Sequence, residues 1–265
     1  MANIGFIGAG KMASAIIKGI ADSGFLAREA IFVYDVNKDA LKYAEKNLKI
    51  QTVTSLEELM KKSSVVLLAT KPFVVNEVLE EIGPHVRNHL VISILAGVST
   101  AKFEAKLPQT RVVRVMPNTP ALINEGMSAI CGGKFAYDED IKFVLEMFSK
   151  LGKAIQVEEK EMDLVTAISG SGPAFFYCFI EKIARAGEKL GLKYETALEL
   201  ATQTALGSSK MIFETPDTPE ELIRNVSTPG GCTEVGNNIL ANSKIEEILF
   251  KTIKRTAEKA KSLGK

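Results

Sequence analysis

The residues that decide the fold of this chain are NIGFIGAGKMA (residues 3–13), an apolar run that leads directly into a glycine-rich turn. Gly8 permits the tight turn, Gly10 lets a phosphate approach the backbone, and Ala13 permits close packing of a helix on a strand. Between a strand and a helix, this pattern is typical of dinucleotide binding, with the pyrophosphate at the helix amino terminus. The alternative is a glycine-rich turn that binds no ligand.

Apolar runs without clean alternation recur along the first 160 residues, as expected of parallel strands that are covered on both faces. The predicted strands are 3–7, 31–34, 65–68, 90–94, 111–115, 127–131 and 154–157. Helix signals lie between them, at 11–22, at the capping box 55–58, at 99–107 and at 138–151. Strands that alternate with helices at this spacing predict an α/β fold with a doubly wound parallel sheet over residues 1–160.

The strand signals stop after Glu158, and residues 161–265 are predicted to form an all-helical domain. Its predicted helices are 162–168, 173–190, 194–213, 219–226, 233–240 and 245–263. Their apolar residues exceed what a bundle of this size buries by itself, so burial against a second copy of the chain is expected. The uncharged stretch 164–180 is interrupted by SGSGP (169–173), which predicts two buried helical pieces rather than a membrane span.

Composition narrows the classes of function. The 265 residues include 33 Lys+Arg and 32 Asp+Glu, a formal charge of +1, so nothing indicates a nucleic-acid partner. The three cysteines are far apart and form no Cys-x-x-Cys pair, so neither a disulfide framework nor a structural zinc site is expected. The amino terminus carries no secretion signal, and we expect a cytoplasmic protein.

Histidine is scarce in this chain, because His85 and His89 are the only two. They lie four positions apart without a third metal ligand nearby, so we predict surface residues rather than a metal pair. A mechanism that needs a histidine acid or base therefore has little to draw on.

Asp35 follows the second predicted strand, at roughly the distance from Gly10 at which an acidic residue meets the adenosine ribose in dinucleotide-binding folds. Its carboxylate could accept both ribose hydroxyls and would repel a 2′-phosphate, which favours NADH over NADPH. Against this, Asn37 and Lys38 could hold a phosphate if Asp35 turned away, and Asp35 could be only a turn or cap residue. The NADH preference is a hypothesis.

Three further loops follow predicted strands and should meet at the edge where open α/β sheets bind ligands. They are ATKP (69–72), LAGV (95–98) and MPNTP (116–120). Lys71 offers a flexible cation near the expected nicotinamide ribose, and Asn118 offers a donor and an acceptor from a loop held by two prolines. Solvated or merely stiff connections are the alternatives, but three loops at one edge favour a binding site.

Two loops in the carboxyl third, SGSGP (169–173) and STPGGCT (227–233), place glycines and hydroxyls before a helix. Unpaired backbone N–H groups at such a start suit a carboxylate. Helix capping without a ligand explains the first loop equally well, whereas the two consecutive glycines of the second favour anion binding. Cys232 has no general base beside it and is predicted to line the pocket rather than act as a nucleophile.

In order and spacing, these motifs resemble those of the pyrroline-5-carboxylate reductases, which catalyse the last step of proline synthesis. The residues that carry the resemblance are GFIGAG (5–10), ATKP (69–72), MPNTPA (116–121), SGSGPA (169–174) and PGGCT (229–233). The resemblance implies an amino-terminal Rossmann-type domain and a helical dimerisation domain whose helices interlock in a homodimer. It also allows a larger ring of dimers such as a decamer.

The resemblance also implies which residues contact cofactor and substrate. The predicted contacts to NAD(P)H, with the adjoining loop positions, are Ile7, Gly8, Ala9, Gly10, Lys11, Met12, Asp35, Asn37, Lys38, Ala69, Thr70, Lys71, Pro72, Leu95, Ala96, Gly97 and Asn118. The substrate carboxylate would bind backbone N–H groups at Gly230, Gly231, Cys232 and Thr233, with Ser171 as a further substrate contact. Family members often have a hydroxyl-rich or Asn-Arg sequence where this chain has DVNK (35–38), which leaves the cofactor phosphate open. Thr228 and Cys232 are milder departures.

The implied reaction is hydride transfer from NAD(P)H to the C=N carbon of 1-pyrroline-5-carboxylate, which gives L-proline. An imine nitrogen is basic enough to take its proton from water or from a weak donor such as the Thr233 hydroxyl, so no histidine is needed. One rival is a β-hydroxyacid dehydrogenase with a lysine at the start of the long interdomain helix, but residues 169–180 contain no lysine. The other is a dinucleotide-sensing regulator, against which the second anion loop argues.

Overall fold

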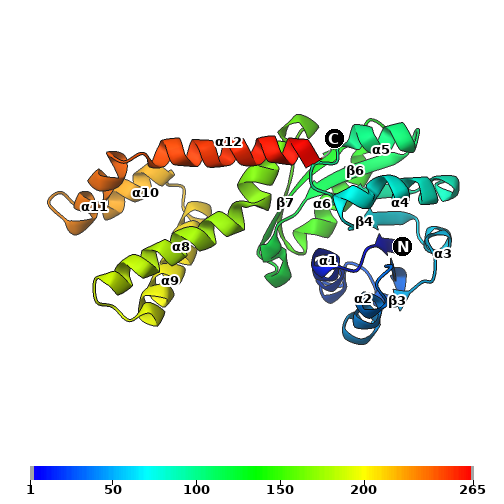
Figure 1. Ribbon diagram of the computed structural model, residues 1–265, viewed down its shortest axis with the longest axis horizontal. Helices are drawn as coiled ribbons and strands as arrows, with labels where there is room; N and C mark the ends of the chain where they lie inside the picture. Colours follow the sequence, from blue (N-terminus) through cyan, green and yellow to red (C-terminus); the bar gives the residue numbers. More distant parts are fainter. Residues whose placement is uncertain (1–2, 264–265) are drawn as a thin grey trace. The chain divides into compact units, whose positions relative to one another are not determined.

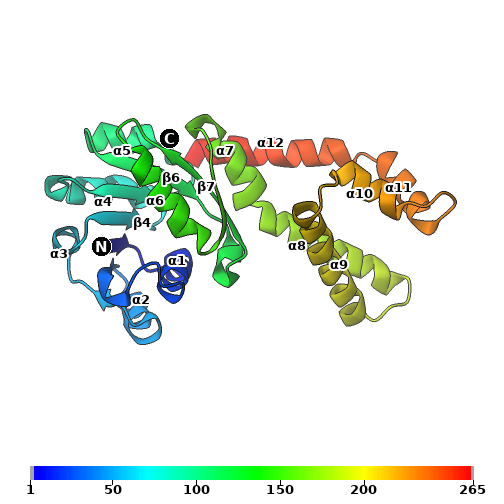
Figure 2. The same cartoon turned by 180° about the vertical axis from the view of Figure 1, so that it is seen from behind.

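The computed structural model describes residues 3–263, which divide by their contacts into two compact units (Figures 1 and 2). The first unit runs to Ser171 and includes the end of the last helix from Lys254 onward. The second unit is Gly172–Ile253. The division by contacts therefore falls later in the chain than the predicted change from strands to helices at residue 160.

The first unit contains one eight-stranded sheet with the strand order β3-β2-β1-β4-β5-β6-β7-β8. The strands are β1 (Ile4–Ile7), β2 (Ile31–Tyr34), β3 (Gln51–Thr52), β4 (Val65–Leu68), β5 (Leu90–Ser93), β6 (Arg111–Met116), β7 (Gly126–Gly132) and β8 (Gly152–Gln156). All neighbours are parallel except β6 and β7, which pair antiparallel. The predicted α/β sheet is confirmed as mostly parallel.

Two details of the sheet differ from the prediction. The connection from Met116 to Gly126 contains only a short 3-10 turn (Thr119–Ile123), whereas a parallel partner needs a crossover of about a dozen residues or more. That is why β7 turns back beside β6. The edge strand β3 has only two residues, too few to show any hydrophobic period.

Helices cover both faces of the sheet in the first unit (Figures 1 and 2). They are α1 (Lys11–Asp22), α2 (Lys38–Tyr43), α3 (Leu56–Lys62), α4 (Val75–Ile82), α5 (Thr100–Lys106), α6 (Asp138–Ser149) and α7 (Met162–Val165). Side chains of α1 and α6 join one buried apolar cluster with the sheet, and those of α3, α4 and α5 join another. These two clusters hold the strand ends in place.

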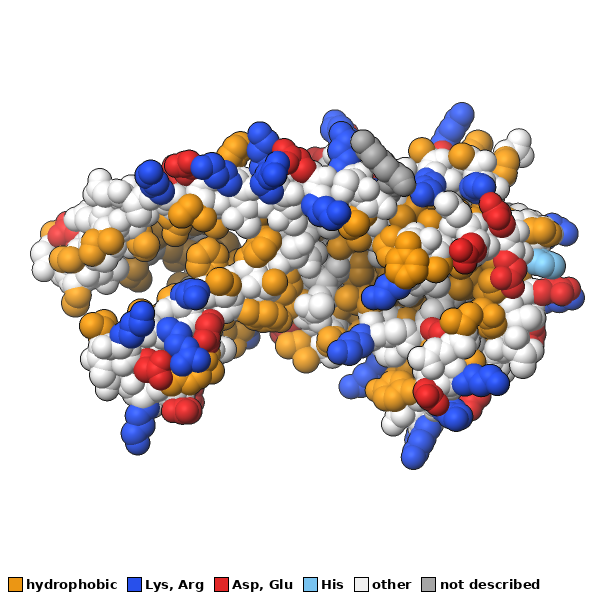
Figure 3. Space-filling model, in the orientation of Figure 1, with side chains coloured by type: hydrophobic (Ala, Val, Ile, Leu, Met, Phe, Trp, Pro, Cys, Tyr) orange, Lys and Arg blue, Asp and Glu red, His pale blue; other side chains and the backbone are white. Residues whose placement is uncertain are grey.

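The second unit holds the predicted helices that follow residue 172, whereas the predicted helix 162–168 lies in the first unit. The helices of the second unit are α8 (Gly172–Lys189), α9 (Tyr194–Glu214), α10 (Pro219–Val226), α11 (Cys232–Ala241) and the part of α12 (Ile245–Leu263) up to Ile253. Its buried apolar side chains are small, as Ala184 of α8 and Ala197 and Ala201 of α9 show. Large apolar side chains lie at its surface instead, on α8 and on α10 and α11 in the space-filling view (Figure 3).

The predicted break at SGSGP (169–173) is wrong. A π-helical turn (Thr166–Gly170) follows α7, and the Ser171 N–H donates to the Thr166 carbonyl oxygen at 2.8 Å, so the helical path continues into α8. The π turn includes Gly170 in its hydrogen bonding, so no helix ends at this segment. Within residues 3–263, Glu159–Lys189 is the one helical run that is long and apolar enough to cross a membrane by length and composition.

Candidate functional site

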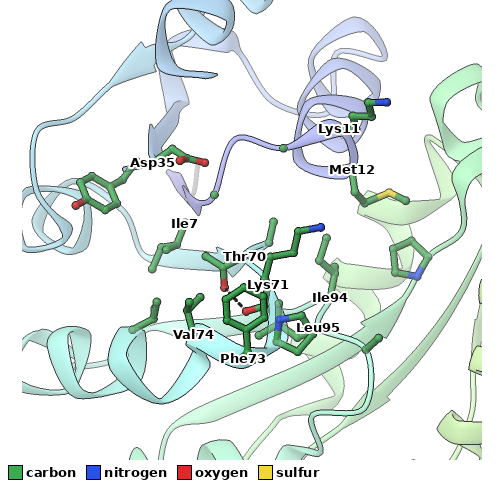
Figure 4. Close-up of a pocket in the computed structure, with 18 of the residues that line it drawn as sticks. Ile7, Lys11, Met12, Asp35, Thr70, Lys71, Phe73, Val74, Ile94 and Leu95 are labelled. Atoms are coloured by element: carbon green, nitrogen blue, oxygen red, sulfur yellow. Dashed lines mark hydrogen bonds between the residues drawn. The ribbon is translucent and has the colours of Figure 1, made fainter. Parts of the chain in front are cut away.

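A pocket of about 1000 Å³ lies at the carboxyl edge of the sheet in the first unit (Figure 4). The register explains its position. Ile7 at the end of β1 is level with Tyr34 of β2 and Leu68 of β4, and Leu68 is level with Ser93 of β5. Loops that leave these strands therefore begin at one edge, as the sequence predicts for a ligand site.

The pocket brings together most of the residues that the sequence assigns to the cofactor. Those that line it are Ile7, Gly8, Gly10, Lys11, Met12, Asp35, Ala69, Thr70, Lys71, Pro72, Leu95, Ala96 and Asn118. Ala9, Asn37, Lys38 and Gly97 do not line it. Met116, Pro117 and Thr119 also line it and belong to the loop 116–120 that the sequence predicts at this edge. Lining residues that the sequence does not predict are Tyr34, Val36, Leu56, Phe73, Val74, Glu77, Val78, Glu81, Ile94 and Gly170.

The glycine turn has the close packing that the motif predicts. Gly8 has φ +106°, and a Cβ there would lie 2.8 Å from the Ala69 carbonyl oxygen, so only glycine fits. Gly10 is the N-cap of α1 and supplies no side chain to cap it, and the first turn of α1 has no acidic residue. Its first N–H groups are thus free of a competing carboxylate and suit a phosphate.

Asp35 is held toward the glycine turn by two backbone donors. Its Oδ2 accepts the Ala9 N–H at 2.7 Å, and its Oδ1 accepts the Asn37 N–H at 2.7 Å. The Asn37 side chain accepts the Asp39 N–H at 2.9 Å and caps α2. These contacts keep the Asp35 carboxylate at the pocket and direct Asn37 into a cap.

Lys11 and Lys71 are the two cations that line the pocket among residues 3–263. Figure 4 shows the Lys71 side chain extending from the loop after β4 across the pocket toward α1. A cation in this position can contact the negative charge of a dinucleotide, which agrees with the predicted place of Lys71.

Asn118 holds the loop after β6 in a fixed orientation. Its Oδ1 accepts the Met127 N–H at 2.8 Å, and its Nδ2 donates to the Ser169 Oγ at 3.4 Å. A Cβ on Gly170, in the same π turn as Ser169, would collide with the Met116 side chain. Glycine at this position lets the π turn approach the pocket wall without displacing the Met116 side chain.

The predicted substrate loop lies in the second unit, at the start of α11. The Gly230 N–H donates to the Glu234 carboxylate at 2.8 Å, and the Gly231 N–H donates to the Thr228 carbonyl oxygen at 2.9 Å. Gly231 is the N-cap of α11 and provides no side-chain cap, so the N–H groups of Cys232 and Thr233 lack an intrahelical acceptor. An anion therefore has unpaired donors to bind at this helix start.

Other predicted features have different outcomes. The SGSGP loop offers no free helix start, because the Ser171 N–H is bonded within the π turn.

His89 is buried at 8% exposure, so the prediction of a surface residue is wrong. Its Nδ1 accepts the Arg87 N–H at 3.0 Å, and its Nε2 lies 3.0 Å from the Met60 carbonyl oxygen. No group of three metal-ligating side chains occurs among residues 3–263.

Comparisons with known proteins match the whole length of the chain. Residues 159–263 match the family model "Pyrroline-5-carboxylate reductase dimerisation", and residues 3–97 match "NADP oxidoreductase coenzyme F420-dependent". The chain is 42% identical over 264 residues to a pyrroline-5-carboxylate reductase of Methanosarcina acetivorans, with 99% of this chain and 98% of that protein covered. It is 35% identical over 262 residues to pyrroline-5-carboxylate reductase 2 of Bacillus subtilis, with 98% and 94% covered.

Solved structures agree with these relatives. A pyrroline-5-carboxylate reductase of Coxiella burnetii superposes with a TM-score of 0.94 at 32% identity and covers 100% of this chain and 99% of its own. A pyrroline carboxylate reductase of Plasmodium falciparum, described with NADP bound, superposes with a TM-score of 0.89 at 35% identity and 100% and 98% coverage.

Proposed function

The chain belongs to the pyrroline-5-carboxylate reductase family, and from this premise we propose how its residues carry out the reaction. It is an NAD(P)-dependent oxidoreductase of proline biosynthesis that reduces 1-pyrroline-5-carboxylate. One observation best supports the assignment of the pocket residues to the cofactor. The glycine turn leads into α1, whose amino terminus has no side-chain cap, at the edge where the loops after β1, β2, β4, β5 and β6 meet.

The residues of the pocket fit a nicotinamide dinucleotide. When bound, the reduced nicotinamide supplies a hydride to the carbon of the C=N bond. The N–H groups at the start of α1 would hold the pyrophosphate, the Asp35 carboxylate would accept ribose hydroxyls, and Lys71 would add positive charge. Asn118, fixed by Met127 and Ser169, would orient the nicotinamide half.

We propose that the chain prefers NADH to NADPH. The Asp35 carboxylate is tied to two backbone N–H groups and cannot swing away without losing both, so a 2′-phosphate would meet its charge. Asn37 is occupied as a helix cap, and neither Asn37 nor Lys38 lines the pocket. The Plasmodium falciparum relative is described with NADP bound, so the preference would be a property of this chain.

Kinetics with both cofactors test the preference. For the wild type we expect a higher kcat/KM with NADH, and for Asp35→Ser we expect the ratio to shift toward NADPH by about tenfold, which equals about 1.4 kcal/mol. Asp39→Ser is the matched control, because Asp39 lies in the first turn of α2 and does not line the pocket. A higher kcat/KM with NADPH in the wild type would refute the preference.

We propose that the loop at the start of α11 binds the substrate carboxylate and that Thr233 contributes its hydroxyl. The uncapped N–H groups of Cys232 and Thr233 support this assignment, because carboxylates are stabilised at helix amino termini. The imine nitrogen gains one proton as its carbon gains the hydride, and the Thr233 hydroxyl, or water, would donate it.

Substitution of Thr233 tests this role. Thr233→Ala should lower kcat/KM for pyrroline-5-carboxylate by about 10- to 100-fold, while the Kd for NAD(P)H stays the same. Thr233→Ser keeps the hydroxyl and should retain most of the activity. Kinetics of Thr233→Ala that equal those of the wild type would remove Thr233 from the mechanism.

A further inference from the structure

Three acidic side chains on α4, Glu77, Glu80 and Glu81, differ in what they contact. Glu77 and Glu81 lie one helical turn apart and both line the pocket, next to Val74 and Val78. Neither carboxylate forms a hydrogen bond or an ion pair with another residue in the described part of the chain. Glu80 does not line the pocket and pairs with Lys106 at 2.9 Å.

The two carboxylates line the same pocket as Asp35. Figure 4 shows Asp35, Ile7 and Val74 toward one end of the pocket and Met12 and Ile94 toward the other. Glu77 and Glu81 follow Val74 by about one and two helical turns, so they share a helix face with Val74 and line the same pocket. The end that holds Asp35 is the one at which the adenosine ribose would bind.

The lining of this pocket therefore includes three carboxylates and several apolar side chains. Val36, Leu56, Val74 and Val78 are among the apolar residues of the lining, and such a surface suits a flat base. Lys71, one of the two cations of the pocket, extends toward α1. A 2′-phosphate carries close to two negative charges, and Coulomb repulsion between like charges acts over a Debye length of about 10 Å at 0.1 M salt.

We propose that Glu77 and Glu81 are specificity-determining residues that act with Asp35 against a 2′-phosphate on the cofactor. This inference rests on the proposed binding of NAD(P)H in this pocket. Asp35 would act at the ribose from the loop after β2, whereas the glutamates would act from α4. The two determinants therefore belong to separate segments of the chain and can be substituted separately. Because Glu77 and Glu81 are exposed and lack partners, their charge is screened by salt.

Binding of cofactor fragments tests the proposal without turnover. AMP and adenosine 2′,5′-bisphosphate differ only in the 2′-phosphate, and their Kd values can be measured by calorimetry on the full-length protein. The variants are Glu77→Gln, Glu81→Gln and the double substitution, with Glu80→Gln as the matched control that removes an equal charge from the same helix. Thermal unfolding of each variant checks that the fold is retained.

For the double variant we expect the Kd of the bisphosphate to fall by about three- to tenfold at low salt, with the Kd of AMP changed less than twofold. The gain should shrink at roughly 0.5 M salt, and the ratio of kcat/KM for NADPH to that for NADH should rise in parallel. Glu80→Gln should leave unchanged both the ratio of the two Kd values and the ratio of kcat/KM for NADPH to that for NADH.

An unchanged Kd ratio in the double variant, or an equal change in Glu80→Gln, would overturn the role of the two glutamates. If Asp35→Ser improves bisphosphate binding and the glutamate variants do not, the glutamates have no role in cofactor specificity, and the proposed NADH preference rests on Asp35. If AMP and the bisphosphate fail to bind any of these proteins, the proposed cofactor pocket itself is wrong. The outcomes thus separate the inference from the function on which it rests.

Discussion

Cys131 lies inside β7, opposite Arg114 of β6, with 2% of its surface exposed. Its thiol donates to the Glu159 carboxylate at 3.3 Å, and Glu159 forms an ion pair with Arg114. Burial above all, and then the charge of Glu159, raises the pKa of the Cys131 thiol far above its usual range. The thiol stays protonated in the folded protein, so it serves packing and hydrogen bonding rather than nucleophilic chemistry.

This environment predicts a pH dependence of stability. In the unfolded chain the thiol ionises near pH 8.5, while in the folded chain it keeps its proton. Above that pH the unfolded state binds fewer protons, so the free energy of unfolding must fall as pH rises. Above about pH 9, we expect the free energy of unfolding of the wild type to fall by about 1.4 kcal/mol per pH unit relative to that of Cys131→Ala.

Urea unfolding at one protein concentration, from pH 7 to pH 10, measures the difference between the two proteins. Cys178→Ala is the control, because Cys178 is exposed. Parallel pH profiles of wild type and Cys131→Ala would contradict the prediction.

Single residues were predictable from the sequence where a local motif defines them. Gly8 and Asp35 sit at the ends of adjacent strands, and strand-turn-helix spacing is enough to place both. Glu77 and Glu81 could not be found in this way, because they reach the pocket from a helix that has no signature of its own. Only the packing of α4 against the sheet brings them into the pocket that Asp35 also lines.

At the scale of single elements, α11 shows how a helix start serves two purposes. Glu234 in its first turn accepts the Gly230 N–H, so a carboxylate of the chain occupies a donor that the substrate carboxylate is proposed to use. Such a reach-back contact stabilises the helix when no substrate is bound. When the substrate carboxylate binds beside it, two negative charges oppose each other.

Glu234→Gln keeps an acceptor for Gly230 but removes the charge. We expect the KM for pyrroline-5-carboxylate to fall by about threefold at low salt, with a smaller gain at high salt. The Ki of cyclopentanecarboxylate, which has the carboxylate but no ring nitrogen, should fall equally. Glu220→Gln, in the first turn of α10, is the control. An unchanged Ki would assign Glu234 to helix capping alone.

The hydrophobic periodicity of the sequence predicts most of the helices and strands, but it does not predict the direction of each strand or how consecutive helices are joined. The prediction places β7 in the sheet but misses its antiparallel direction, which the short connection after β6 determines. The Ser171 N–H bonds within the π turn (Thr166–Gly170), whereas the glycines of this segment predict a break in the helix. Side-chain patterns record burial, whereas strand direction and helix joints depend on backbone paths.

At the scale of the whole molecule, the composition of the second unit is explained by a partner. Its buried side chains are small, while Phe176, Phe179 and Ile183 of α8 and Ile239 of α11 are exposed. Surfaces of this kind are rare on monomers. Residues 159–263 match the dimerisation model, which supports a homodimer. A decamer and a cytoplasmic location stay predictions.

If two copies bury the α8 face together, one charge on that face should separate them. Ile183 is 62% exposed in the single chain, and Ile183→Glu would place an unpaired carboxylate in the dimer interface. We expect light scattering at micromolar concentration to show monomers for Ile183→Glu and dimers or larger assemblies for the wild type. Lys142→Glu, an exposed change on α6 of the first unit, should keep the wild-type assembly. Because most of the second unit's large apolar side chains are exposed in one chain, the monomer should also unfold at a lower temperature. An Ile183→Glu protein that stays dimeric with an unchanged Tm would place the interface on another face.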